Sequence, residues 1–111
     1  MAAGYQELFI EQGTDYATTI TLDGVNGMPF NLSNYIAKSQ IRKSYYSSSA
    51  NSFTASVTGI ANGEITLSMT AANTANLTPG RYLYDLVITA PSGTKTRVVE
   101  GIVNVLAGVT Q

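Results

Sequence analysis

Apolar and polar residues alternate with a period of two along most of this 111-residue sequence. In the segment 16–22, the even-numbered positions carry Tyr, Thr, Ile and Leu, whereas the odd-numbered positions carry only alanine and threonine. Successive side chains of a β-strand point to opposite sides of its sheet, so this alternation predicts strands with one buried face. Turn-forming residues separate seven such segments, and we expect strands at residues 6–11, 15–22, 35–44, 53–58, 64–69, 81–90 and 95–106.

Glycine, asparagine, aspartate and proline mark the points where the chain reverses, because they tolerate or favour turn conformations. The stretch from Thr70 to Leu77 is rich in alanine and asparagine and predicts one helical turn capped by Thr70. The serine-rich residues 44–52 predict a loop. The strongest reversal signals are Asp23-Gly24, Asn26-Gly27, Asn62-Gly63 and Pro91-Ser92-Gly93.

Short strands at this spacing predict an all-β fold, an immunoglobulin-like two-sheet β-sandwich of about seven antiparallel strands. No linker, repeat or shift in composition divides the sequence, so we expect a single domain over residues 1–111. A hydrophobic fraction of 44% and dispersed charges are typical of a globular chain. The core alone must stabilise this chain, because it has no cysteine for a disulfide.

The composition excludes several classes of function. The sequence has neither histidine nor cysteine, which removes the commonest general base, the commonest metal ligand and any thiolate site. Its net charge is -1 and its six basic residues are dispersed, whereas nucleic-acid binding needs a basic patch. No apolar run is long enough to span a membrane, and no secretory signal is visible. We expect a soluble protein, made in a cytoplasm, that binds neither nucleic acid nor membrane.

The seven carboxylates predict no active site. Each falls on a strand exterior, a turn or an edge, whereas a glycosidase needs two that face each other across a cleft. No serine is paired with a base, and no glycine-rich loop could cradle a phosphate. We therefore expect a protein that is not an enzyme and that uses no cofactor, metal or small-molecule substrate. Calcium binding by Asp15, Asp23 or Asn26 would need ligands at alternate positions, which are missing.

The segment TPGRYLYDLVI, residues 78–88, places Tyr82, Tyr84, Leu86 and Ile88 on one continuously apolar face, which predicts that they enter the core. A tyrosine at the start of a strand, just after a Pro-Gly turn, is typical of the tyrosine corner of immunoglobulin-like sandwiches. We expect Tyr82 to be this structural tyrosine, with its hydroxyl bonded to a backbone group between residues 69 and 78. Tyr84 is the alternative.

The opposite face of the last two predicted strands combines apolar and acidic residues. One interpretation is a solvated cluster of Asp85, Arg42 and Glu100, worth about 0 to 1 kcal/mol. The other is an interface with a partner, because apolar residues on both faces of a strand are unusual in an isolated sandwich. The candidate interface residues are Leu83, Asp85, Val87, Val98, Glu100 and Ile102.

Four segments of the sequence form a recognisable set: LFIEQGTDYATTITL, PFNLSNYIAKSQIRKS, GEITLSMTAANTANLTPGRYLYDLVI and VVEGIVNV. Together they resemble small immunoglobulin-like virion proteins of tailed bacteriophages and the N-terminal sandwich domains of their baseplate and fibre-attachment proteins. The matching motifs are Glu11-Gln12-Gly13, Asn31 to Tyr35, Gln40-Ile41-Arg42, Gly80 to Leu86 and Glu100 to Val105. The serine-rich insertion at 44–52 departs from the pattern. The resemblance implies a fold and a virion setting, and it carries over no catalytic residue.

The resemblance implies a non-enzymatic structural or adaptor subunit of a phage virion, in the tail, the baseplate or the fibre attachment. Its partners would be other virion proteins and copies of itself, as a homo-oligomer, and it would be made in the cytoplasm of the bacterial host. A capsid decoration (cement) protein is one alternative. A carbohydrate-binding module, with Tyr45 and Tyr46 stacking on a sugar, is an alternative of another class.

Overall fold

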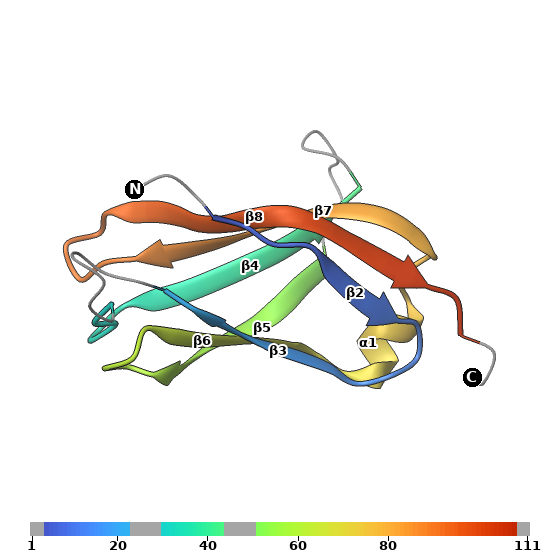
Figure 1. Cartoon of the computed structure of the whole chain (residues 1–111), viewed down its shortest axis with the longest axis horizontal. Coiled ribbons are helices and arrows are strands. Elements are labelled where there is room, and N and C mark those ends of the chain that lie inside the picture. The colour runs from blue at the N-terminus through green and yellow to red at the C-terminus, as the bar shows by residue number, and fades with distance from the viewer. Residues whose placement is uncertain (1–3, 23–29, 44–50, 109–111) are drawn as a thin grey trace.

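The computed structural model describes residues 4–22, 30–43 and 51–108. This part of the chain is built from short strands and one short helix (Figure 1), so the predicted all-β class is confirmed. The predicted turns within 23–27, the loop residues 44–50 and both ends of the chain lie outside the described residues. The elements are β1 (Gly4–Tyr5), β2 (Leu8–Glu11), β3 (Tyr16–Thr21), β4 (Ile36–Arg42), β5 (Asn51–Gly59), β6 (Glu64–Met69), α1 (Ala71–Ala75), β7 (Gly80–Thr89) and β8 (Lys95–Leu106).

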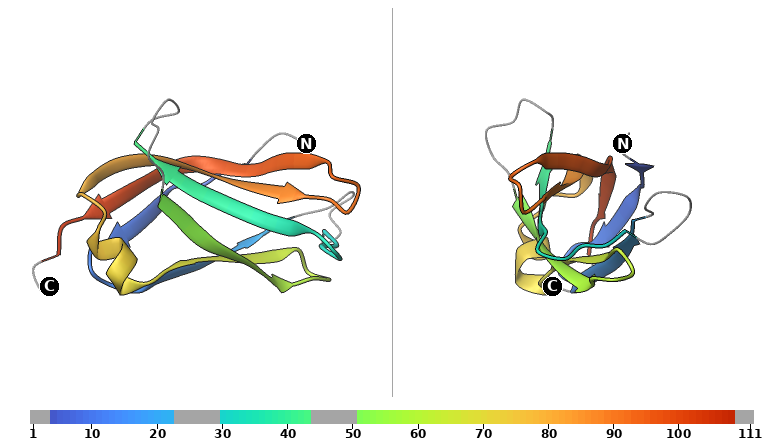
Figure 2. Two further views of the ribbon diagram at one scale, coloured as in Figure 1. Left: turned by 180° about the vertical axis from the view of Figure 1, so that it is seen from behind. Right: turned by 90° about the vertical axis from the view of Figure 1, so that its left-hand side faces the viewer.

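The strands form one curled sheet in the order β1-β8-β7-β4-β5-β6-β3, and β2 pairs with β8 beside β1. Strand β5 passes from one layer of the curled sheet to the other, because its start pairs with β4 whereas residues from Thr54 onward pair with β6. The result is a larger layer of β1, β2, β8, β7 and β4 and a smaller layer of β3, β6 and most of β5. Figure 2 shows how the sheet curls around a common interior.

The first two strands run parallel to β8, whereas the other neighbouring strands of the described chain run antiparallel. The prediction of a purely antiparallel sheet is therefore wrong at this edge. The N–H of Gln6 donates to the Glu100 carbonyl at 3.1 Å, and the N–H of Gln12 donates to the Leu106 carbonyl at 2.9 Å. Alternating side chains specify which face of a strand is buried, but they do not specify the direction of its neighbour.

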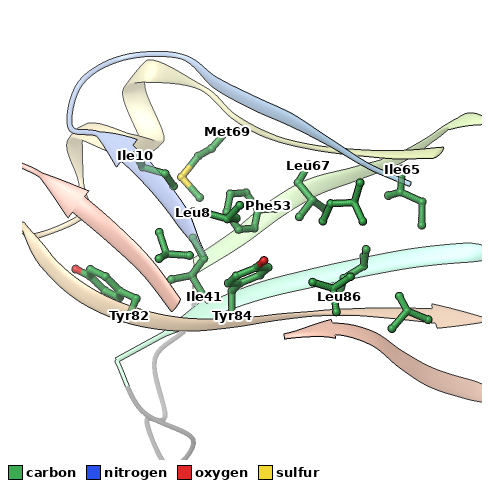
Figure 3. Packing of buried hydrophobic residues seen from close by; sticks show 14 of the residues in the cluster. Leu8, Ile10, Ile41, Phe53, Ile65, Leu67, Met69, Tyr82, Tyr84 and Leu86 are labelled. Atoms are coloured by element: carbon green, nitrogen blue, oxygen red, sulfur yellow. The ribbon is translucent and has the colours of Figure 1, made fainter. Parts of the chain in front are cut away.

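Inward-facing side chains from both layers meet in one apolar core (Figure 3). Leu8, Ile65 and Leu86, from β2, β6 and β7, are at most 3% exposed. The ring of Phe53 in β5 contacts Tyr16 of β3 and Tyr84 of β7, with centroid distances of 6.0 and 6.2 Å. Burying one such aliphatic or aromatic side chain contributes roughly 1.5 to 3 kcal/mol, so this core is the main source of stability.

The crossing from β6 to β7 is anchored by α1. The hydroxyl of Thr70 caps the helix by accepting from the Asn73 N–H at 3.3 Å, as the sequence predicts. Thr74 is fully buried, and its hydroxyl accepts from the Gly13 N–H at 3.1 Å and donates to the Thr14 carbonyl at 2.7 Å. A single threonine therefore ties the helix to the turn between β2 and β3.

Tyr82 lies at the start of β7, directly after this crossing, and is 6% exposed. Its hydroxyl donates to the Thr78 carbonyl at 2.7 Å, within the upstream range that the sequence predicts. The neighbouring core tyrosine, Tyr84, makes a long-range contact instead, because its hydroxyl donates to the Gln6 carbonyl at 2.6 Å. The two rings fix different parts of the chain: Tyr82 holds the crossing, and Tyr84 holds the N-terminal segment.

Candidate functional site

Five of the six candidate interface residues share the outward side of the larger layer. Leu83 pairs with Ile102, and Asp85 pairs with Glu100, across the β7–β8 ladder. All of them are partly exposed, because the inward positions between them fill the core. We call this surface the outer face, and define it by Leu83, Asp85, Val87, Glu100 and Ile102.

Val98 does not belong to the outer face, and its assignment there is wrong. The side chain is 3% exposed and lies in the core, as does that of Val99, which is 6% exposed. The register of β8 shifts at this point, because Leu86 pairs with Val99 whereas Val87 pairs with Arg97. An extra residue in β8 is a β-bulge, which breaks the alternation on which the assignment depended.

The bulge also brings Arg97 to the outer face, beside Asp85 and Glu100. The sequence had suggested Arg42 as the basic member of this cluster. The Arg97 Nε lies 3.3 Å from an Asp85 carboxylate oxygen, and its Nη1 lies 3.4 Å from a Glu100 carboxylate oxygen. Arg42 donates to the Gln40 side-chain oxygen at 3.0 Å. All three members of the Arg97 cluster are at least one-third exposed, so each ion pair contributes at most about 1 kcal/mol to stability.

A shallow hollow of about 180 Å³ lies over this cluster. Strands β4, β7 and β8 all contribute to its lining, so it sits near the middle of the larger layer. Among the described residues, its lining contains no serine, threonine or lysine. Its mixture of charged and apolar groups fits non-covalent contact with a protein surface. The lining residues are Gln40, Arg42, Leu83, Tyr84, Asp85, Arg97 and Glu100.

Exposed aromatic and apolar side chains continue from the outer face onto the first two strands. Tyr5 pairs with Glu100 and Phe9 pairs with Asn104, so both rings lie on the outward side of the sheet. They are 66% and 59% exposed, and Leu106 at the end of β8 is 47% exposed. These residues are not among the interface candidates predicted from the sequence. The alternation from Leu8 to Glu11 would have placed Phe9 outside, but their proximity to β8 depends on the parallel pairing.

The smaller layer has a different outward surface, on which small hydroxyl side chains predominate. Thr66 lies at its centre and hydrogen-bonds to the hydroxyls of Thr19, at 3.1 Å, and Thr58, at 3.0 Å. Outward positions of β3 and β5 carry only alanine, serine or threonine. In the part of the chain that the structure describes, exposed large apolar side chains therefore gather on the larger layer and its first strands, apart from Ile60 in a turn after β5.

The described residues were also compared with the requirements of a metal site and of a membrane span. Within 4–22, 30–43 and 51–108, no three acidic, histidine or cysteine side chains gather closely enough to hold a metal ion. No helix of the described chain is long and apolar enough to cross a membrane. Tyr45 and Tyr46, the candidate sugar platform, lie outside the described residues. No protein-family model and no curated protein matches this chain.

Proposed function

We propose that this protein is a non-enzymatic structural or adaptor subunit of a tailed-phage virion, with the outer face as its contact with a neighbouring virion protein. The observation that carries the proposal is that, among the described residues, exposed apolar and aromatic side chains gather around a compact charged cluster on the larger layer. Protein interfaces combine aromatic and apolar anchors with a few paired charges. The virion setting rests on the resemblance of the sequence motifs to phage proteins.

The proposal includes an immunoglobulin-like sandwich as the fold. Three features support it: β3, β6 and β5 lie in one layer, β4, β7 and β8 lie in the other, and β2 runs alongside β8. The hydrogen bond from Tyr82 to the carbonyl of Thr78 is a fourth, since a tyrosine at this corner is typical of such sandwiches. A rigid sandwich of this kind would present the outer face as a fixed surface.

The composition of the outer face is more typical of a surface that a neighbouring subunit covers than of a surface that faces solvent. Leu83 and Ile102 are adjacent on neighbouring strands, and the Arg97 cluster lies beside them. Apolar side chains that are grouped and partly exposed in this way are typical of a protein contact surface. When a neighbour covers them, their burial drives association, while the charges set orientation and exclude wrong partners.

The test is incorporation of variants into particles. Leu83→Lys with Ile102→Lys adds two positive charges to the outer face, and both sites are partly exposed, so the monomer should fold. We expect this variant to be absent from purified particles, or reduced at least tenfold. Thr54→Lys with Ser56→Lys is the matched control, because it adds the same charges to exposed sites on the opposite layer. Wild-type incorporation of the Leu83/Ile102 variant would refute the proposed interface.

A further inference from the structure

Strand β3 forms one end of the curled sheet and pairs, within the described chain, only with β6. The Leu22 N–H donates to the Gly63 carbonyl at 2.8 Å, in the same register as the β3–β6 ladder. Antiparallel ladders bond through alternate residues, so the even-numbered residues of β3 bond to β6. Ala17, Thr19 and Thr21 therefore direct their backbone N–H and carbonyl groups away from the sheet.

The edge of β3 lacks the protection that natural sheet edges usually have. Its six residues, YATTIT, contain no charge, proline or glycine, and four of them are β-branched. Charged residues on an edge strand are a common device against pairing with another chain. The other free edge, at β2, has this device, because Glu7 and Glu11 flank the exposed ring of Phe9. The two edges therefore differ in their capacity to accept a further strand.

We propose that β3 pairs antiparallel with β3 of a second copy of this chain. Thr19 is the middle one of the three residues whose backbone groups point outward. A two-fold axis beside Thr19 therefore brings the outward N–H and carbonyl groups of one copy opposite those of the other. Thr19 then lies opposite the partner's Thr19, and Ala17 lies opposite the partner's Thr21. Each pair exchanges two backbone hydrogen bonds. The inference concerns the isolated protein and does not depend on a virion role.

The side chains are compatible with this pairing. Ala17, Thr19 and Thr21 are all exposed and have small side chains, which leave room for a neighbouring strand. The hydroxyl row from Thr58 through Thr66 to Thr19 would continue across the axis into the second copy. Threonine pairs across antiparallel strands are favourable, whereas directly opposed like charges are not.

The resulting dimer is expected to be weak. Pairing of one short edge strand buries much less than the roughly 1,200 Å² of a stable interface, so we expect dissociation constants in the micromolar to millimolar range. Such a contact becomes strong when other interfaces hold several copies together, because the second contact is then intramolecular. An uncharged edge of this kind suits a protein that assembles in many copies.

Cysteine cross-linking tests the register, because the chain has no cysteine of its own. In the pair, the α-carbons of residue 19 lie about 5.5 Å apart, whereas those of residue 66 would be about 14 Å apart, three strand spacings. We expect Thr19→Cys, treated with a short thiol cross-linker, to form covalent dimers. Thr66→Cys is the matched control, because it loses the same Thr19–Thr66 hydroxyl contact but should cross-link at least tenfold more slowly.

Sedimentation of charged variants gives a second, independent measurement. Ala17→Lys with Thr21→Lys places positive charges along the exposed edge without touching the core. We expect its thermal melt to match that of the wild type and its dimer dissociation constant to rise at least tenfold. The proposal is overturned if the wild type remains monomeric at millimolar concentration, or if the charged variant dimerises as well as the wild type. Equal cross-linking rates for the Thr19→Cys and Thr66→Cys variants would overturn it as well.

Discussion

Replacing Gly101 with alanine should disrupt the attachment of the N-terminal strands. Gly101 is buried in β8, and an added Cβ would lie 2.1 Å from the Gln6 carbonyl oxygen and 3.1 Å from the Tyr84 ring. The first distance is far below van der Waals contact, so the backbone at Gln6 must move. The movement would break or strain two hydrogen bonds: from the Tyr84 hydroxyl to the Gln6 carbonyl, and from the Gln6 N–H to Glu100.

The decrease in the free energy of unfolding that we expect for Gly101→Ala follows from these contacts. Overpacking of a dense interior costs about 1 to 3 kcal/mol, and each lost hydrogen bond costs about 1 kcal/mol. The lower conformational entropy of alanine in the unfolded chain offsets about 0.5 to 1 kcal/mol. The free energy of unfolding should therefore fall by about 2 to 4 kcal/mol. For a chain of this size, the melting temperature should fall by about 8 to 16 °C.

Urea and thermal denaturation followed by circular dichroism would measure this loss. The control is Gly4→Ala, in the same N-terminal segment, because its added Cβ would meet only the Val98 carbonyl oxygen at 3.6 Å, an ordinary contact. Gly4→Ala should unfold with the wild-type midpoint or slightly above it. If Gly101→Ala also unfolds at the wild-type midpoint, the close approach of Gln6 to β8 is wrong.

Three further predictions concern buried hydroxyls. Tyr82→Phe should lower the free energy of unfolding by about 1 kcal/mol, because it removes only the bond to Thr78; an unchanged urea midpoint would contradict this. Thr74→Val should cost about 2 kcal/mol by leaving the Gly13 N–H without its acceptor, whereas Thr74→Ser should retain most of the stability. Burial raises the pKa of Tyr84 above its ordinary value near 10.0, so the unfolded chain loses this proton first as the pH rises. The free energy of unfolding should stay constant up to about pH 9 and decrease above pH 10. A decrease of equal size in the Tyr84→Phe variant would show that Tyr84 is not the cause.

The sequence predicts the strands well because local alternation and turn chemistry specify them. Six of the predicted segments coincide with strands to within a few residues, and the cap at Thr70 and the bond of Tyr82 follow from short-range chemistry. The strand predicted at 6–11 begins two residues later, at Leu8, and the short strand Gly4–Tyr5 before it was not predicted. Local patterns could not predict the contact of Tyr84 with Gln6, which joins residues 78 positions apart.

The candidate interface was only partly predictable for a related reason. The alternation places Leu83, Asp85 and Ile102 outside correctly, but it fails at Val98, where the bulge adds a residue. A bulge depends on how two strands pair, so a single-strand pattern does not reveal it. Arg97 reaches the acidic cluster only because of this shift.

The proposed function assigns this protein to a phage particle, so a density map of intact particles of that kind would test the central claim most directly. The proposed function predicts ordered copies of the sandwich in which Leu83, Ile102 and the Arg97 cluster are covered by a neighbouring virion protein. Peptide mass spectrometry of the same particles would establish whether the chain is present. Particles that lack the chain, or copies whose outer face is open to solvent, would contradict the account.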